Sequence, residues 1–188
     1  MKGSVRVEMS PIIEEFVHHL QDLAQAQFPV SEVGPFFEKN PIPLNDLESY
    51  IFFADQRYTR NLIYKTPSFE LILLCWASNQ ASPIHGHEGE KCWMRVELGS
   101  LTFTNYQEKD DGALELVNEE VGEQGFVDGP AIIHKVENKT KQPAISLHLY
   151  ARPFKQCDVF DHASHEKTKV SLSYFSMYGQ LINESIDL

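Results

Sequence analysis

Residues 82–100 read SPIHGHEGEKCWMRVELGS, which joins a pair of histidines to an alternating run. His85 and His87 are two positions apart, and residues so spaced in a β-strand project from the same face, so both imidazoles can reach one metal ion. Apolar residues then occupy every second position from Cys92 to Leu98, as in a half-buried strand. The stretch predicts β structure with two candidate metal ligands. Taken alone, the pair is equally consistent with two surface histidines beside a turn.

The rest of the chain continues this β pattern after a helical start. Residues 11–28 carry one apolar stripe at helical spacing, and a second short helix is expected from Asn45, with Glu48 completing a capping box. From about residue 58 the chain consists of short apolar or alternating runs bounded by turn residues, at 69–76, 92–98, 100–106, 113–117, 131–137, 144–151 and 170–175. This predicts a mainly β protein, a sandwich or small barrel with N-terminal α-helices. We expect one domain over residues 1–188, with the helical segment of about 1–55 packed on the barrel.

Composition narrows the partners. The net charge is −11 and no run of lysine or arginine stands out, so neither a nucleic-acid surface nor an anionic membrane surface is expected. The three cysteines are too few and too odd in number for a disulfide framework, and no signal peptide is recognisable. We therefore expect reduced thiols and a cytoplasmic location.

Wider spacing relates the histidine pair to a known pattern. Cys92 lies five residues after His87 and Gly99 seven after Cys92, which resembles the first cupin motif, HxH(x)4E(x)6G, with cysteine at the glutamate position. His134 and Asn138 resemble the close of the second cupin motif, although the preceding Gly129-Pro130 is inverted. The resemblance implies a cupin fold, a small β-barrel or jelly roll.

Three neutral imidazoles facing into a barrel make a plausible divalent-metal site with open positions. With Cys92 at the carboxylate position the metal would keep its full double charge, which favours an anionic ligand such as a thiolate. Two alternatives remain. Cys92 could itself be a ligand, which would favour zinc, or the three histidines could be satisfied core residues.

A second polar constellation lies in SLHLYARPF, residues 146–154. Ser146, His148 and Tyr150 share one face of the expected strand. Turned inward, they would be costly to bury unless they bonded to each other or to a ligand. The alternation alone slightly favours the opposite orientation, with this face in water.

Five motifs together resemble the cysteine dioxygenase family, in order and in spacing, over roughly residues 45–178. They are YTRNL (58–62), LILLCW (71–76), SPIHGHEGEKC (82–92), HKVEN (134–138) and SLHLYARPFKQCDVFD (146–161). The resemblance implies an iron-dependent enzyme that oxidises L-cysteine with O2 to cysteine sulfinic acid, in cysteine catabolism on the route to taurine and sulfate. One Fe(II) per chain is implied, and we expect a monomer whose partners are these small substrates.

The resemblance also assigns roles to matching positions. It makes His85, His87 and His134 the iron ligands. It implies that Arg60 binds the substrate carboxylate and that Tyr58 lies beside the substrate.

Further roles concern the strand behind the metal. The resemblance implies a thioether cross-link between Cys92 and Tyr150, and a hydrogen-bonded relay through Ser146 and His148 that orients the Tyr150 hydroxyl. It places Trp76 behind the site.

Other functions stay open at this point. A related dioxygenase could act on 3-mercaptopropionate or cysteamine, although Arg60 favours a carboxylate-bearing thiol. A non-catalytic metal-binding cupin and a zinc or nickel cupin isomerase are the remaining alternatives.

Overall fold

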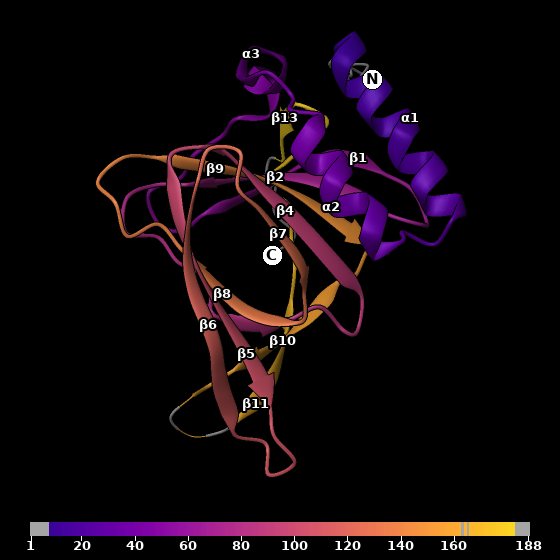
Figure 1. Ribbon diagram of the computed structural model, residues 1–188. Coiled ribbons are helices and arrows are strands. Elements are labelled where there is room, and N and C mark those ends of the chain that lie inside the picture. Colours follow the sequence, from indigo (N-terminus) through magenta and orange to yellow (C-terminus); the bar gives the residue numbers. More distant parts are fainter. Residues whose placement is uncertain (1–7, 163, 165, 183–188) are drawn as a thin grey trace, which may run out of the picture.

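The computed structural model describes residues 8–162, 164 and 166–182 (Figure 1). Its helices all precede the first strand. They are α1 (Pro11–Gln25), α2 (Val30–Lys39), α3 (Leu44–Leu47) and the single 3₁₀ turn η1 (Glu48–Tyr50). None of these helices has the length and hydrophobicity of a membrane span.

The strands form two sheets. One has the order β13-β12-β1-β2-β9-β4-β7 and the other β11-β10-β3-β8-β5-β6. Their bounds are β1 (Thr59–Lys65), β2 (Glu70–Trp76), β3 (Ile84–Gly86), β4 (Lys91–Leu98), β5 (Ser100–Glu108), β6 (Leu114–Glu123), β7 (Val127–Ala131), β8 (Ile133–Glu137), β9 (Ala144–Ala151), β10 (Gln156–Phe160), β11 (Lys167–Ser171), β12 (Ser176–Met177) and β13 (Gln180–Leu181).

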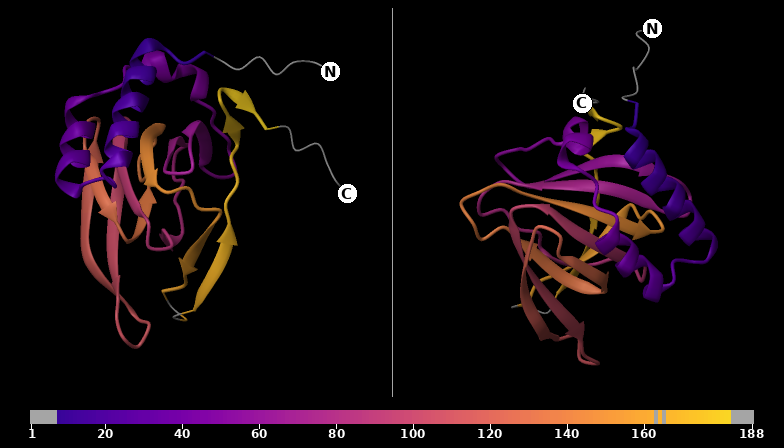
Figure 2. Two further views of the ribbon diagram at one scale, coloured as in Figure 1. Left: turned by 90° about the vertical axis from the view of Figure 1, so that its right-hand side faces the viewer. Right: turned by 45° about the horizontal axis from the view of Figure 1, so that its top comes forward.

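The seven-stranded sheet is a middle layer, which explains why β2 is apolar throughout. Leu71, Leu73 and Cys75 pack in one cluster with residues of α1 and α2, while Ile72 and Leu74 pack in a second cluster with residues of the opposite sheet. Figures 1 and 2 show the two long helices across the outer face of this sheet. Each fully buried leucine contributes about 1.5–3 kcal/mol. The fold is thus a cupin jelly roll with N-terminal helices, as the sequence predicted.

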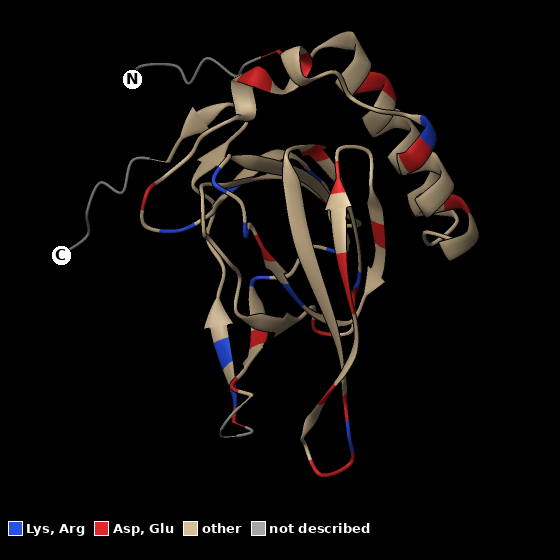
Figure 3. Cartoon of the chain, turned by 60° about the vertical axis from the view of Figure 1, so that its left-hand side comes forward, with Lys and Arg blue, Asp and Glu red and all other residues tan. Residues whose placement is uncertain are grey.

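Acidic side chains dominate the outside, in keeping with the net charge of −11. Figure 3 marks the acidic residues along the helices, on several strands and in the connecting loops. The surface of the described chain therefore repels rather than attracts polyanions.

The helical predictions need three corrections. The first helix was predicted to extend to residue 28, but it ends at Gln25. The chain turns at Gln27 and Phe28, which both have positive φ. The next helix, α2, was not predicted, since Gly34 and Pro35 lie inside it. Burial of two of its apolar side chains outweighs that low propensity.

The third correction concerns the expected capping box. The short α3 begins at Leu44 after Pro43, so Asn45 lies within it and no side-chain cap is formed. Packing of the buried Leu47 holds this turn in place of the cap.

Two strand predictions were also wrong. The run 131–137 was expected as one strand, but it is divided at Ile132 between β7 and β8, which belong to different sheets. The strand expected at 170–175 begins earlier in the chain and ends at Ser171, since β11 spans Lys167–Ser171. The predictions at 69–76, 92–98, 100–106, 113–117 and 144–151 match β2, β4, β5, β6 and β9 within a few residues, except that β6 continues to Glu123.

Gly99 supplies a fold test. Its φ is +74°, and a Cβ added there would lie 2.6 Å from the backbone oxygen of Pro143. We expect Gly99→Ala to lower the free energy of unfolding by roughly 2–6 kcal/mol, because overpacking and left-handed strain each cost about 1–3 kcal/mol. Urea unfolding measures this. The control Gly34→Ala has open space in α2 and should gain roughly 0.5–1 kcal/mol. A neutral Gly99→Ala would contradict the argument.

Candidate metal centre and substrate cavity

Three histidines converge at β3 and β8, the two central strands of the six-stranded sheet. His85 on β3 pairs directly with His134 on β8, and His87 follows immediately after β3 ends at Gly86. The ring centroids are 4.7 Å apart for His85 and His134, 5.1 Å for His85 and His87, and 4.9 Å for His87 and His134. One ligand nitrogen from each lies within 4.8 Å of the others. The structure therefore brings together the three ligands that the sequence predicted.

Burial makes these imidazoles neutral donors. It lowers the pKa of His85 to about 4 and of His87 to about 3, and it places that of His134 well below its ordinary value. Neutral imidazole is the form that binds metals.

The hydrogen bonding of the three rings also supports a metal site. Among the described residues, neither ring nitrogen of His87 has a hydrogen-bond partner of normal geometry, nor does Nδ1 of His134. His85 places Nδ1 3.0 Å from the Pro83 carbonyl oxygen, which leaves Nε2 for a metal and fixes the ring. Such orphaned nitrogens disfavour the alternative of satisfied core histidines. The donor set fits a divalent metal with open coordination positions.

Cys92 is not part of this ligand group, which contains neither a thiol nor a carboxylate. Cys92 instead pairs directly with Tyr150 across β4 and β9, and both side chains are buried in the same cluster. Burial and the nearby Asp128 raise the pKa of the Cys92 thiol. Because Cys92 lies against Tyr150 and outside the histidine group, the arrangement disfavours the zinc alternative.

Ser146, His148 and Tyr150 all face inward, opposite to the orientation that alternation alone favoured. All three are buried, and Trp76 Nε1 donates to Ser146 Oγ over 2.9 Å. Ser146 Oγ lies 2.8 Å from His148 Nε2. The burial penalty is therefore offset by hydrogen bonds between the inward groups themselves.

The link expected between His148 and the Tyr150 hydroxyl takes a different form. His148 uses Nε2 toward Ser146, and its ring lies stacked on the Tyr150 ring at 6.0 Å. Arg60 Nη1 instead donates to the Tyr150 hydroxyl over 3.4 Å. Burial raises the pKa of Tyr150, so its hydroxyl keeps its proton at neutral pH.

A cavity of about 290 Å³ opens beside His85 and is lined by Tyr58, Arg60 and Tyr150. Tyr58 stacks on Trp76 with ring centroids 4.4 Å apart. Burial alone lowers the pKa of the Arg60 guanidinium, but Tyr150, Tyr58 and Glu70 together raise it above its ordinary value. The cavity thus combines a fixed cation with one edge of the histidine group, and it can hold a small anionic molecule against both.

Two residues at this site were missed by sequence reasoning. Glu70 is completely buried next to Arg60, and Cys157 lines the cavity. Glu70 had a signal in the sequence: it is the single charged residue in an otherwise apolar strand. Cys157 had none beyond its place near two phenylalanines.

Comparison with known proteins places the chain. The family model for cysteine dioxygenase type I matches residues 1–163. Cysteine dioxygenase type 1 of Homo sapiens is 32% identical over 157 residues, which cover 80% of this chain and 78% of the relative. The enzyme of the same name from Danio rerio is 28% identical over 177 residues, covering 89% and 88%. Among solved structures, an RmlC-like cupin protein from Desulfovibrio desulfuricans covers 55% of this chain and 91% of its own, with 21% identity and a TM-score of 0.40.

A cupin fold that carries a three-histidine metal group defines a class of metal-binding cupins, to which this protein belongs. Within it, the chain is a member of the cysteine dioxygenase type I family. Family and site together support a metal-dependent thiol dioxygenase.

Metal retention tests the histidine group. Purified protein is expected to bind about one divalent metal ion, and replacing His85, His87 or His134 by alanine should remove most of it, because the described residues offer only these three ligands to the metal. Elemental analysis after dialysis measures the stoichiometry. The exposed His19 supplies a matched control, and His19→Ala should keep wild-type metal content. Full occupancy in all three site variants would contradict the assignment.

Proposed function

We propose that this protein oxidises L-cysteine with O2 to cysteine sulfinic acid, using one iron(II) per chain bound by His85, His87 and His134. The observation that carries the proposal is the position of Arg60. Its guanidinium shares the 290 Å³ cavity with His85, so one small molecule can reach both a metal at the histidines and the cation. A thiol with a carboxylate a few atoms away suits this pair of anchors.

Iron(II) would lower the pKa of a bound thiol and bring O2 next to the sulfur. Both oxygen atoms end on sulfur and cysteine supplies all four electrons, so no external reductant is needed. The protein's own contribution is orientation. Arg60 holds the carboxylate by charge-assisted hydrogen bonds, and three neutral imidazoles leave the metal charge to attract the thiolate.

Tyr150 has the second orienting role. Its protonated hydroxyl faces Arg60 and lies at the cavity, where it donates a hydrogen bond toward the reacting oxygen atoms. Trp76, Ser146 and His148 form the polar chain next to its ring, and His148 stacks on the ring face. These contacts support a positioning role for Ser146 and His148, exerted through ring packing.

The cross-strand pairing of Cys92 with Tyr150 supports the proposed thioether. Directly opposed residues on antiparallel strands have Cβ atoms about 4.5–5.5 Å apart, within reach of a bond between the sulfur and the ring. The bond would remove rotamer freedom from Tyr150 and prevent the Cys92 thiol from competing for iron.

The alternative substrates and functions can be distinguished from the proposed one. Arg60 disfavours cysteamine, which has no carboxylate, whereas 3-mercaptopropionate has one and lacks only the amine. Product analysis by mass spectrometry after incubation with each thiol decides between them. Metal analysis would identify zinc or nickel in a cupin isomerase. A non-catalytic cupin would consume no oxygen with cysteine. Monomeric state, cytosolic location, a single domain and the route to taurine remain predictions.

Arg60→Gln is the direct test of substrate choice. A hydrogen bond to a charged group contributes roughly 1.5–3 kcal/mol, so losing it should reduce kcat/KM for cysteine by about one to two powers of ten. Iron content should be unchanged. Oxygen consumption with cysteine and with cysteamine in both proteins gives the coupling between the arginine and the carboxylate.

The control is Arg152→Gln, because Arg152 is exposed and pairs only with Glu90 among the ion pairs of the described residues. It should keep wild-type efficiency. Equal losses for both thiols in Arg60→Gln would mean that Arg60 supports the fold or the metal centre instead.

The cross-link has its own test. Enzyme that has turned over in air should contain a fraction lighter by two hydrogens, with a joined tryptic peptide containing Cys92 and Tyr150. Cys92→Ser should abolish this species yet retain measurable turnover, because the bond orients a group and supplies no ligand. Cys157→Ser is the control: Cys157 is also buried and lines the cavity, but its loss should leave the joined peptide. Absence of that peptide from turned-over wild type would refute the cross-link.

A further inference from the structure

A buried carboxylate lies directly behind the cavity arginine. Glu70 begins β2, and its side chain has no exposed surface. It pairs in register with Lys65 on β1 and with Tyr150 on β9, so two strand pairings fix its place. A carboxylate in such a position is strongly destabilising unless cations and hydrogen-bond donors surround it.

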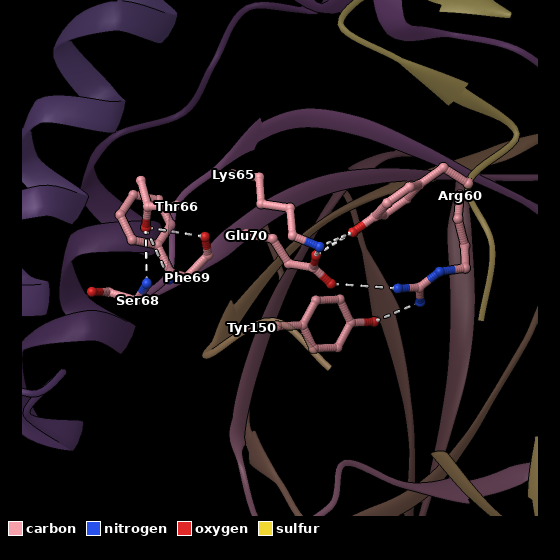
Figure 4. A network of polar contacts seen from close by, with 8 residues as sticks. Arg60, Lys65, Thr66, Ser68, Phe69, Glu70 and Tyr150 are labelled. Atoms are coloured by element: carbon pink, nitrogen blue, oxygen red, sulfur yellow. Dashed lines mark hydrogen bonds and ion pairs between the residues drawn. The ribbon is translucent and has the colours of Figure 1, made fainter. Parts of the chain in front are cut away.

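The two oxygens of Glu70 have different partners (Figure 4). Oε2 lies 3.1 Å from Lys65 Nζ and accepts a hydrogen bond from the Tyr174 hydroxyl, and Lys65 Nζ also donates to that hydroxyl over 2.7 Å. Oε1 lies 3.7 Å from Arg60 Nη2 and has no hydrogen-bond partner among the described residues. One oxygen is thus fully occupied, and the other is left to Arg60.

This arrangement holds the guanidinium on two sides. Nη1 donates to the Tyr150 hydroxyl and Nη2 faces Glu70, while Nε is buried with no hydrogen-bond partner in the described part of the chain. An arginine has five N–H donors, so several remain for a ligand. A long side chain loses much rotamer freedom when it binds. An anchored guanidinium has already lost that freedom before the substrate arrives.

Lys65 keeps Glu70 from neutralising the arginine. With two cations around one carboxylate, the Arg60–Glu70–Lys65 cluster carries one net positive charge beside the cavity. Without Lys65 and Tyr174, both Glu70 oxygens would be free to pair with Arg60 as a bidentate partner. The guanidinium would then be drawn away from an incoming carboxylate.

We propose that Glu70 is a positioning residue that presents Arg60 to the carboxylate of the substrate, and that Lys65 and Tyr174 hold Glu70 in that role. This deepens the proposed function and rests on it. The cluster acts on binding of the carboxylate and not on the metal or the oxygen chemistry. Its effect therefore belongs in KM for carboxylate-bearing thiols.

A buried carboxylate next to Arg60 can have two roles, and Glu70→Gln changes KM for cysteine in opposite directions for the two. If Glu70 positions Arg60, its loss raises KM for cysteine by about five- to ten-fold, the size expected for one hydrogen bond or ion pair, while kcat stays within about two-fold. If Glu70 only offsets the charge of Arg60, its loss lowers KM for cysteine. Cysteamine reports effects unrelated to the carboxylate, and its KM should not change.

Lys65→Met tests the same cluster from its solvent side, where Lys65 is 30% exposed. It should also raise KM for cysteine alone, because the released Oε2 then competes for Arg60. The double variant with Glu70→Gln should be no worse than Glu70→Gln, since no carboxylate remains to compete. Should Glu70→Gln fail to fold, Lys65→Met and Tyr174→Phe provide the result.

Glu97→Gln is the matched control. Glu97 is another buried glutamate beside an arginine, 3.4 Å from Arg95, and does not line the cavity. It should leave both KM values unchanged. A lower KM for cysteine in Glu70→Gln, or equal changes for both thiols, would overturn the proposal.

The two proposals fail separately. If wild-type protein consumes no O2 with cysteine, the proposed function fails. A double-mutant cycle of Arg60→Gln and Glu70→Gln in urea unfolding still measures the anchor between them. No coupling in that cycle overturns the positioning role whatever the substrate.

Discussion

The antiparallel pairing of β9 with β2 and β4 is the constraint on which the rest of the site depends. It places Tyr150 opposite Cys92 on one side and opposite Glu70 on the other. Since side chains alternate along a strand, a shift of one residue would turn Ser146, His148 and Tyr150 to the helix-covered face. The apolar residues between them would then face the cavity. Burial of Leu147 and Leu149 against the helical layer makes that slip costly.

The two sheets contribute different residues to the site. The six-stranded sheet supplies the three imidazoles, through the pairing of β3 with β8. The seven-stranded sheet supplies Arg60 and Tyr150, which line the cavity together with His85. In the function proposed above, a ligand between the sheets is held at the metal from one side and oriented from the other. Changes to substrate preference can occur on one sheet without disturbing the metal ligands on the other.

Electrostatics give this arrangement its preference for anions. The predicted ligand set contains no negative charge, and burial keeps the histidines neutral. Arg60 adds a permanent positive charge, and Lys65 offsets the carboxylate that anchors it. In an otherwise strongly acidic protein, the cavity is a local region that favours an anionic ligand.

The sequence by itself determined the features that depend on local spacing. Alternation predicted β9 within its exact bounds, and the spacing of His85, His87 and His134 predicted the metal group. The succession of short apolar or alternating runs predicted the β class, and the order of the motifs predicted the family. These succeed because strand periodicity and short motifs are written in neighbouring residues.

Only the tertiary structure decided what depends on distant neighbours. It turned Ser146 and its face inward, because Trp76 on β2 satisfies its hydroxyl. It made a helix of Val30–Lys39 despite Gly34, because the helix buries apolar side chains on the sheet. It placed Glu70 behind Arg60, ten residues away in sequence, through the pairing of β1 with β2. Burial and strand register are properties of the folded chain, and no local pattern encodes which distant groups they bring together.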